Sequence, residues 1–98
     1  MYVTKLGVIG AGTMGSGIAA LAVSAGVPVV LLDIPGKVGD RDAPAKAGLE
    51  RAKKARPASF MDVSRSALVT TGNLEDSLDL LRDCDLVLEA IKIGRAHV

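Results

Sequence analysis

The 98-residue sequence is poor in aromatic residues and cysteine, and its charges nearly balance. With no tryptophan and only Tyr2 and Phe60, the core must be aliphatic and alanine-rich, and the chain lacks aromatic platforms on which nucleic-acid bases could stack. The single cysteine, Cys84, excludes an internal disulfide, suits a reducing, cytoplasmic location and is expected to be a small buried side chain. A formal net charge of +1 gives no electrostatic reason to expect a nucleic-acid or anionic-membrane partner.

Residues 6–32 carry no charge and follow Lys5, so a signal peptide or a membrane span has to be considered. Glycines crowd the first half of this run and would weaken a helix there, and Pro28 would kink a continuous span. The run ends in four aliphatic residues followed by Asp33, which is typical of a buried strand. We therefore expect no membrane span.

A glycine-rich turn, residues 10–15 (Gly-Ala-Gly-Thr-Met-Gly), lies between a predicted strand at 2–9 and a predicted helix at 13–25. A second apolar strand at 29–32 follows and ends at Asp33. This order of strand, glycine turn, helix, strand and acid is the fingerprint of a dinucleotide-binding βαβ unit. The apolar side chains at helical spacing are expected to face the sheet: Met14, Ile18, Leu21, Ala22 and Ala25.

The glycines and the start of the helix predict a diphosphate site. Gly10 makes the tight turn, Gly12 leaves room for the diphosphate, and Gly15 lets the helix lie close on the sheet. The unpaired N–H groups at the start of the helix, near Thr13 and Met14, and the positive end of its dipole favour an anion there.

Asp33 lies 23 residues after Gly10, about where an acid accepts hydrogen bonds from the adenosine ribose. A carboxylate at this place would repel a 2′-phosphate, so NAD is favoured over NADP. The pattern of Gly10, Gly12, Gly15 and Ala19 also fits FAD, which the residues alone do not exclude.

The rest of the sequence continues the alternation of strand and helix. We predict a loop at 34–41, helices at 43–56, 59–67 and 74–81, strands at 68–71 and 85–91, and a turn at 72–73. Right-handed crossovers then give an α/β, Rossmann-type parallel sheet in the order 3-2-1-4, truncated after the fourth strand. Ligands bind at the carboxyl ends of such strands, between residues 10–15 and 89–91.

Charged side chains outside the glycine turn are interpreted as structural. Asp42 is placed to cap the helix that starts at residue 43, and a row of basic side chains on that helix is expected to face solvent: Lys46, Arg51, Lys53, Lys54 and Arg56. Glu75, Asp76 and Asp79 are interpreted as capping and surface charges rather than metal ligands, so no metal site is predicted.

Residues 8–20 with 30–33, and residues 71–91, resemble the NAD-binding domain of 3-hydroxyacyl-CoA dehydrogenases. Residues 40–60 are similar to the long multidomain members that act in fatty-acid oxidation. The resemblance implies NAD-dependent oxidation of an L-3-hydroxyacyl-CoA to the 3-ketoacyl-CoA during β-oxidation. It also implies that backbone around Ala90 and Ile91 lines the nicotinamide side of the cofactor.

By the same resemblance, the catalytic histidine–glutamate pair and the helical domain that meets the acyl-CoA lie downstream of this sequence, and the parent enzyme is a homo-oligomer. The family pattern is lost after Ile91, and residues 93–98 translate one reading frame of a common short-read sequencing adapter. We therefore expect a partial NAD-binding domain over 1–92 and a non-native tail over 93–98. No catalytic role is given to His97, and the fragment is expected to bind NAD weakly at most and to be inactive.

Alternatives from other classes stay open at this point. A β-hydroxyacid dehydrogenase shares Gly-x-Gly-x-Met-Gly, but those enzymes commonly use NADP and would have Asn and Arg in place of Asp33-Ile34. A flavin-dependent oxidoreductase fits the glycines. A nucleotide-sensing module without enzyme activity would fit the lack of catalytic groups in these residues.

Overall fold

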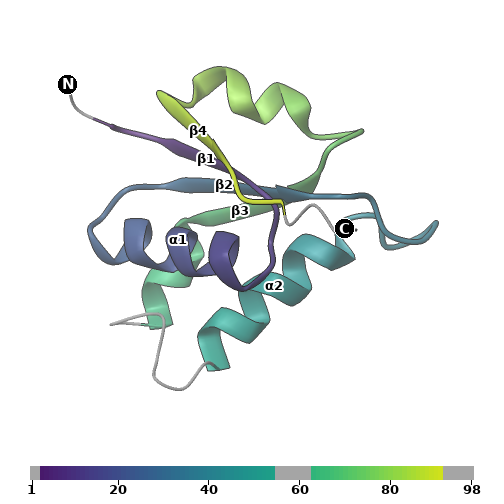
Figure 1. The fold of residues 1–98 in the computed structure, drawn as a ribbon, viewed down its shortest axis with the longest axis horizontal. Helices are drawn as coiled ribbons and strands as arrows, with labels where there is room; N and C mark the ends of the chain where they lie inside the picture. The colour runs from purple at the N-terminus through teal and green to yellow at the C-terminus, as the bar shows by residue number, and fades with distance from the viewer. Residues whose placement is uncertain (1–2, 55–62, 92–98) are drawn as a thin grey trace, which may run out of the picture.

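The computed structural model describes residues 3–54 and 63–91, which form a four-stranded parallel sheet with helices on both faces (Figure 1). The elements in chain order are β1 (Leu6–Ile9), α1 (Thr13–Ser24), β2 (Val29–Asp33), α2 (Ala43–Lys54), the 3-10 helix η1 (Val63–Leu68), β3 (Val69–Asn73), the 3-10 helix η2 (Leu78–Asp83) and β4 (Leu86–Glu89). The strand order β3-β2-β1-β4 confirms the predicted Rossmann-type sheet.

The register of the strands brings three carboxyl ends together. Ile9 at the end of β1 lies opposite Leu32 of β2 on one side and Glu89 of β4 on the other. The chain therefore leaves β1, β2 and β4 at the same edge of the sheet, and β1 and β4 are the neighbours between which the strand order reverses.

The core is aliphatic, as the scarcity of aromatic residues predicts. Val8 of β1 and Leu31 of β2 are fully buried beneath α1 and α2, while the other face of β2 buries Val30 and Leu32. In Figure 1, α1 and α2 lie on one side of the sheet and η2 lies on the other. Both faces are covered, which is why these strands are continuous apolar runs rather than alternating ones.

The predicted inner face of α1 is only partly right: Ile18 and Ala22 pack against the core, but Met14, Leu21 and Ala25 are exposed. Met14 and Leu21 are 68% and 72% exposed, and the helix buries small residues instead: Gly15, Ser16, Ala19, Ala20 and Val23. The cause is the close approach of α1 to the sheet, because a Cβ on Gly15 would lie 1.6 Å from the carbonyl oxygen of Gly10. At this contact only glycine fits, and mostly small residues fill the buried face of the helix around it.

Two strands differ in their bounds from the prediction, and the Asp85 carboxylate lies where both of them start. Asp85 Oδ2 accepts hydrogen bonds from Thr4 N at 2.6 Å and Lys5 N at 3.1 Å, so β1 begins only at Leu6. The strand β4 spans Leu86–Glu89 rather than the predicted 85–91. The Thr4 hydroxyl and both N–H groups lower the pKa of Asp85.

The segment after β3 also differs from the prediction. Gly72 and Asn73 pair with Leu32 and Asp33 as the last residues of β3, where a turn was predicted. Residues 74–81 form a turn followed by η2 rather than an α-helix, because Asn73 Oδ1 accepts hydrogen bonds from the N–H groups of Glu75 and Asp76. A side chain that bonds to nearby backbone in this way competes with helical hydrogen bonds.

Some predictions fall on residues that the structure does not describe. They are the end of the second helix at 55–56, residues 59–62 of the third, and the tail at 93–98.

Cys84 is half-buried, and burial raises the pKa of its thiol. Within residues 3–54 and 63–91, no helix is long and apolar enough to span a membrane.

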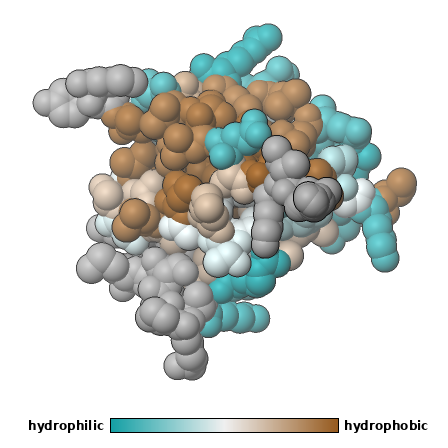
Figure 2. All heavy atoms as spheres, in the orientation of Figure 1, coloured by the Kyte–Doolittle hydropathy of each residue, from teal (hydrophilic) through white to brown (hydrophobic). Residues whose placement is uncertain are grey.

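The strand β4 lies at the edge of the sheet and pairs only with β1 among the described strands. Leu86 and Val87 are each about two-fifths exposed. Figure 2 shows apolar side chains gathered over the part of the molecule where β1 and β4 lie.

Candidate functional site

A cleft of about 760 Å³ opens at the carboxyl ends of β1, β2 and β4. Its walls are the glycine turn, the residues just after β2 and the end of β4: Gly10, Ala11, Gly12, Thr13, Met14, Asp33, Ile34, Glu89, Ala90 and Ile91. The structure therefore brings together all the predicted site residues except Gly15. Ala11, Ile34 and Glu89 complete the walls.

Gly10 lies where the turn after β1 crosses the end of β4. Its φ of +106° is a left-handed conformation that favours glycine, and a Cβ there would lie 2.9 Å from backbone atoms of Ala90 and Ile91. Gly10 N donates to the carbonyl oxygen of Leu32 at 2.7 Å, while Ala90 N donates to that of Ile9 at 2.7 Å. These contacts fix the turn against both neighbouring strands.

Gly12 stands at the N-cap position of α1, and no side chain caps the helix there. A Cβ on Gly12 would meet nothing within 4 Å, so this side of the turn is open. The first helical hydrogen bond is Ser16 N to Gly12 O, which leaves the N–H groups of Thr13 and Met14 unpaired. Among the described residues, no acceptor meets Gly12 N–H either. The open helix start is therefore suited to an anion.

Gly15 lies behind the turn rather than in the cleft. Its close contact with Gly10 O makes it the residue that lets α1 approach β1. Its part in the site is thus to set the position of the helix start, as the third glycine of the fingerprint does.

The Asp33 carboxylate is held by backbone on both oxygens. Oδ2 accepts a hydrogen bond from Ala11 N at 2.9 Å, and Oδ1 accepts one from Ile34 N at 2.7 Å. Each carboxylate oxygen has two lone pairs, so acceptor capacity remains on the cleft side. The side chain is only partly buried and lines the cleft beside the glycine turn.

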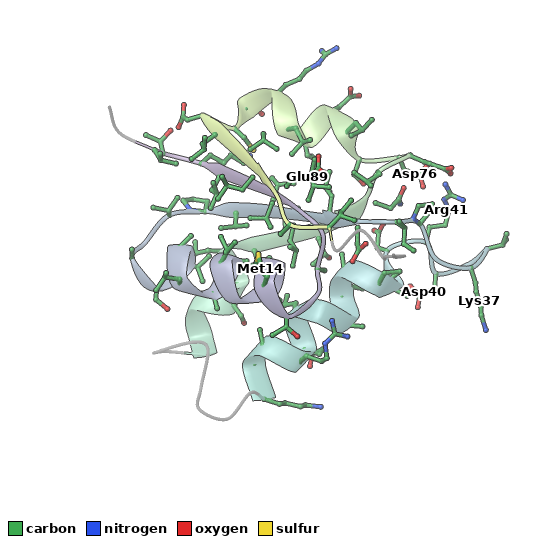
Figure 3. The ribbon with its side chains drawn as sticks, viewed as in Figure 1. Met14, Lys37, Asp40, Arg41, Asp76 and Glu89 are labelled. Carbon is green, nitrogen blue, oxygen red and sulfur yellow. The ribbon has the colours of Figure 1, made fainter. Side chains whose placement is uncertain are left out.

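The positive potential that the cleft offers to an anion comes from main-chain N–H groups at the start of α1. Among the residues that the structure describes, the charged ones that line the cleft are Asp33 and Glu89, and both are acidic. In Figure 3, Glu89 lies at the end of β4 and Met14 lies on α1. Within this described lining, an anionic ligand would thus meet N–H groups rather than cationic side chains. Among the described residues, no cluster of three His, Cys, Asp or Glu could hold a metal ion.

Sequence reasoning missed two residues of α2 that contact the glycine turn. Arg51 is exposed, as expected, but it also donates from Nη2 to the carbonyl oxygen of Ala11 at 2.9 Å. Gly48, one helical turn earlier, packs so closely that a Cβ would lie 2.1 Å from that same oxygen. A glycine and an arginine three residues apart were the available signal, but nothing local says which loop they face.

A second polar cluster lies beside the site, at the ends of β2 and β3. Arg41 forms ion pairs with Glu75 and Asp76, and Figure 3 shows Arg41 and Asp76 side by side. Asn73 Nδ2 donates to Asp42 at 2.8 Å and to Asp76 at 3.0 Å. The Arg41 guanidinium, with help from Asn73, lowers the pKa of Asp76. Glu75 and Asp76, which were predicted to be capping and surface charges, therefore tie the loop after β2 to the end of β3.

These features define a class of protein: a Rossmann-type dinucleotide-binding domain with its cleft at the switch point of the sheet. Residues 5–93 match the family described as 3-hydroxyacyl-CoA dehydrogenase, NAD binding domain, and the chain belongs to that family. The match identifies NAD as the cofactor of the family, which the glycine pattern alone did not separate from FAD.

Named relatives agree with this membership. The chain is 59% identical over 101 residues to a probable 3-hydroxyacyl-CoA dehydrogenase of Deinococcus radiodurans, an alignment that covers 99% of this chain and 29% of that protein. It is 46% identical over 92 residues to a putative fatty acid oxidation complex trifunctional enzyme of Rickettsia felis, an alignment that covers 91% of this chain and 12% of that protein. The crystal structure of (S)-3-hydroxybutyryl-CoA dehydrogenase from Ralstonia eutropha matches with a TM-score of 0.64 at 29% identity, and the match covers 95% of this chain and 32% of that chain. The chain thus spans less than a third of the length of each of these relatives.

Proposed function

We propose that this chain is the NAD-binding part of an enzyme that oxidises an L-3-hydroxyacyl-CoA to the 3-ketoacyl-CoA in fatty-acid β-oxidation. The observation that carries the proposal is the cleft itself, in which an uncapped helix start, a glycine turn and Asp33 face the same space. The names of the relatives, which include a probable 3-hydroxyacyl-CoA dehydrogenase and a putative fatty acid oxidation complex enzyme, support this choice of substrate.

The residues fit NAD in three parts of the cleft. N–H groups of Gly12, Thr13 and Met14 would receive the diphosphate, where no side chain competes for them. Asp33 would accept hydrogen bonds from the adenosine ribose hydroxyls, and its charge would repel a 2′-phosphate. The backbone at Ala90 and Ile91 would line the nicotinamide side, across the cleft from Asp33. The chemistry that NAD supplies when bound is acceptance of a hydride.

The other functions of the parent enzyme are assigned to parts outside these residues. We propose that a downstream domain holds the acyl-CoA and the catalytic acid–base pair, and that the full enzyme is a cytoplasmic homo-oligomer. Within this chain the work is binding and orientation: the glycine turn holds the diphosphate and Asp33 selects the cofactor.

The test is a calorimetric titration of the 98-residue protein with NAD, NADP and FAD, followed by a turnover assay with acetoacetyl-CoA and NADH. We expect measurable binding of NAD, at least about tenfold weaker binding of NADP because of charge repulsion at Asp33, and no turnover. Preferential binding of FAD, or equal binding of NAD and NADP, would contradict the proposal. Turnover by this chain alone would contradict the proposal that the catalytic acid–base pair lies in a downstream domain.

A further inference from the structure

The two peptide groups that flank Ala11 are held from opposite sides. In the Gly10–Ala11 peptide, the N–H of Ala11 donates to Asp33, and the carbonyl oxygen of Gly10 lies against Gly15. In the Ala11–Gly12 peptide, the carbonyl oxygen of Ala11 accepts from Arg51 and lies against Gly48. Three of the four polar groups in these two peptides thus have a fixed partner or neighbour within the described protein.

The fourth group is the N–H of Gly12. A trans peptide is planar, and its C=O and N–H point in opposite directions. Because the Ala11 carbonyl oxygen is held on the α2 side, Gly12 N–H must point away from α2. Gly12 is exposed and lines the cleft. The hydrogen bond from Arg51, together with the packing of Gly48 against the same oxygen, therefore sets the direction in which this donor points.

We propose that Arg51 is a positioning residue for NAD, which orients Gly12 N–H toward the diphosphate through its hydrogen bond to the Ala11 carbonyl. This inference rests on the proposed function and adds to it a residue from outside the glycine fingerprint. Arg51 does not line the cleft, so it acts through the turn rather than by contact with the cofactor. Glycine at 12 makes the restraint necessary, because glycine leaves the backbone free to rotate.

Three variants separate this role from a simple effect of charge. Arg51→Met removes donor and charge, Arg51→Lys keeps a donor and the charge, and Lys54→Met removes an exposed charge from the same last turn of α2. We expect Arg51→Met to weaken NAD binding about tenfold, because binding must then also supply the free energy of orienting Gly12 N–H toward the diphosphate. Arg51→Lys should restore binding to within about threefold, and Lys54→Met should leave it within about twofold, because only the donor at position 51 matters.

Each variant is titrated with NAD by calorimetry at low salt and in about 1 M NaCl, where the screening length falls to about 3 Å. Its melting temperature is measured by circular dichroism. The weakening by Arg51→Met should persist at high salt and should exceed what the change in melting temperature explains. A loss that vanishes at high salt, or that Lys54→Met reproduces, would overturn the inference in favour of electrostatic attraction.

Wild-type protein gives a second test that does not depend on a folded variant. In a ¹H–¹⁵N spectrum, NAD should move the Gly12 amide resonance more than the Arg51 Nε resonance. A Gly12 amide that does not respond, or an Arg51 resonance that moves most, would overturn the inference. If wild type binds NAD and Arg51→Met binds it equally well, the positioning role fails while the proposed function stands. If wild type does not bind NAD, the proposed function itself fails.

Discussion

Replacement of Asp33 by asparagine tests cofactor choice and loop anchoring in one variant. The two carboxylate oxygens accept from two different donors, Ala11 N at 2.9 Å and Ile34 N at 2.7 Å. Asparagine has one acceptor oxygen, and its NH2 group cannot accept a hydrogen bond from the second N–H. At least one of these backbone donors therefore loses its partner, along with the charge that both hydrogen bonds use.

The magnitude follows from those contacts. A hydrogen bond to a charged group contributes about 1.5–3 kcal/mol, and partial exposure of Asp33 places the loss in unfolding free energy near the lower end, at about 1.5 kcal/mol. Loss of the charged acceptor for the ribose should weaken NAD binding about tenfold or more. Removal of repulsion, which is about 1 kcal/mol for unit charges 4 Å apart in water and about 4 kcal/mol at an effective dielectric constant of 20, should strengthen NADP binding relative to NAD.

The assay is a fluorescence titration with NADH and NADPH, which is clean because the chain contains no tryptophan. Chemical denaturation of the same samples gives the unfolding free energy. Asp40→Asn is the matched control, since it makes the same change in charge in the exposed loop after β2 but outside the cleft. If Asp33→Asn leaves the ratio of NADH to NADPH affinity unchanged, or behaves as Asp40→Asn does, the role given to this carboxylate is refuted.

Three further predictions concern the fold around the site. Gly15→Ala should lower the unfolding free energy by several kcal/mol or prevent folding, because its Cβ would lie 1.6 Å from a carbonyl oxygen. Gly17→Ala on the same helix is the control: its Cβ would meet nothing within 4 Å, and the variant should be more stable by up to about 1 kcal/mol. Equal melting temperatures of the two variants would contradict this prediction. Arg41→Gln should destabilise the protein at neutral pH but not in strong acid. The pKa of Asp76 is lowered in the folded state, so its contribution is present above its unfolded value near 3.8 and is lost as the pH falls through the folded value; denaturation across pH 2–7 checks that the two proteins converge only at the acid end. Leu86→Lys should reduce aggregation in light-scattering measurements without loss of NAD binding, because a charged side chain discourages strand pairing at the exposed edge of β4. Unchanged scattering would show that the chains do not associate through this edge.

The βαβ unit and the sheet order could be predicted because their signals are local. Gly10 takes a φ of +106°, which glycine adopts at low cost, and α1 begins at Thr13 as expected. Asp33 is the last residue of a strand whose apolar run is visible in the sequence. Alternation of strands and helices with right-handed crossovers then leaves few ways to order four strands.

What could not be predicted depended on which residues come into contact once the chain is folded. The inner face of α1 was assigned by hydrophobicity, but the approach of Gly15 to Gly10 selects small side chains, and Leu21 is left outside. The turn after β3 follows from hydrogen bonds that Asn73 makes locally and with Asp42, which lies 31 residues away. In each case the residue type was compatible with the prediction, and the partner decided the outcome.

The contrast between Asp33 and Arg51 shows why a glycine fingerprint is necessary but not sufficient for such a site. Glycine permits the turn at residues 10–12, yet the same freedom would let its peptides point in many directions. Two side chains remove that freedom by bonding to the same residue, Ala11: Asp33 holds its N–H from 22 residues away and Arg51 its carbonyl from 40. Asp33 is part of the known sequence fingerprint because it is also expected to bind the ribose. Arg51 does not line the cleft, so no sequence motif marks its position. A chain with the same glycines but no donor at the position of Arg51 should therefore fold in the same way and bind NAD more weakly.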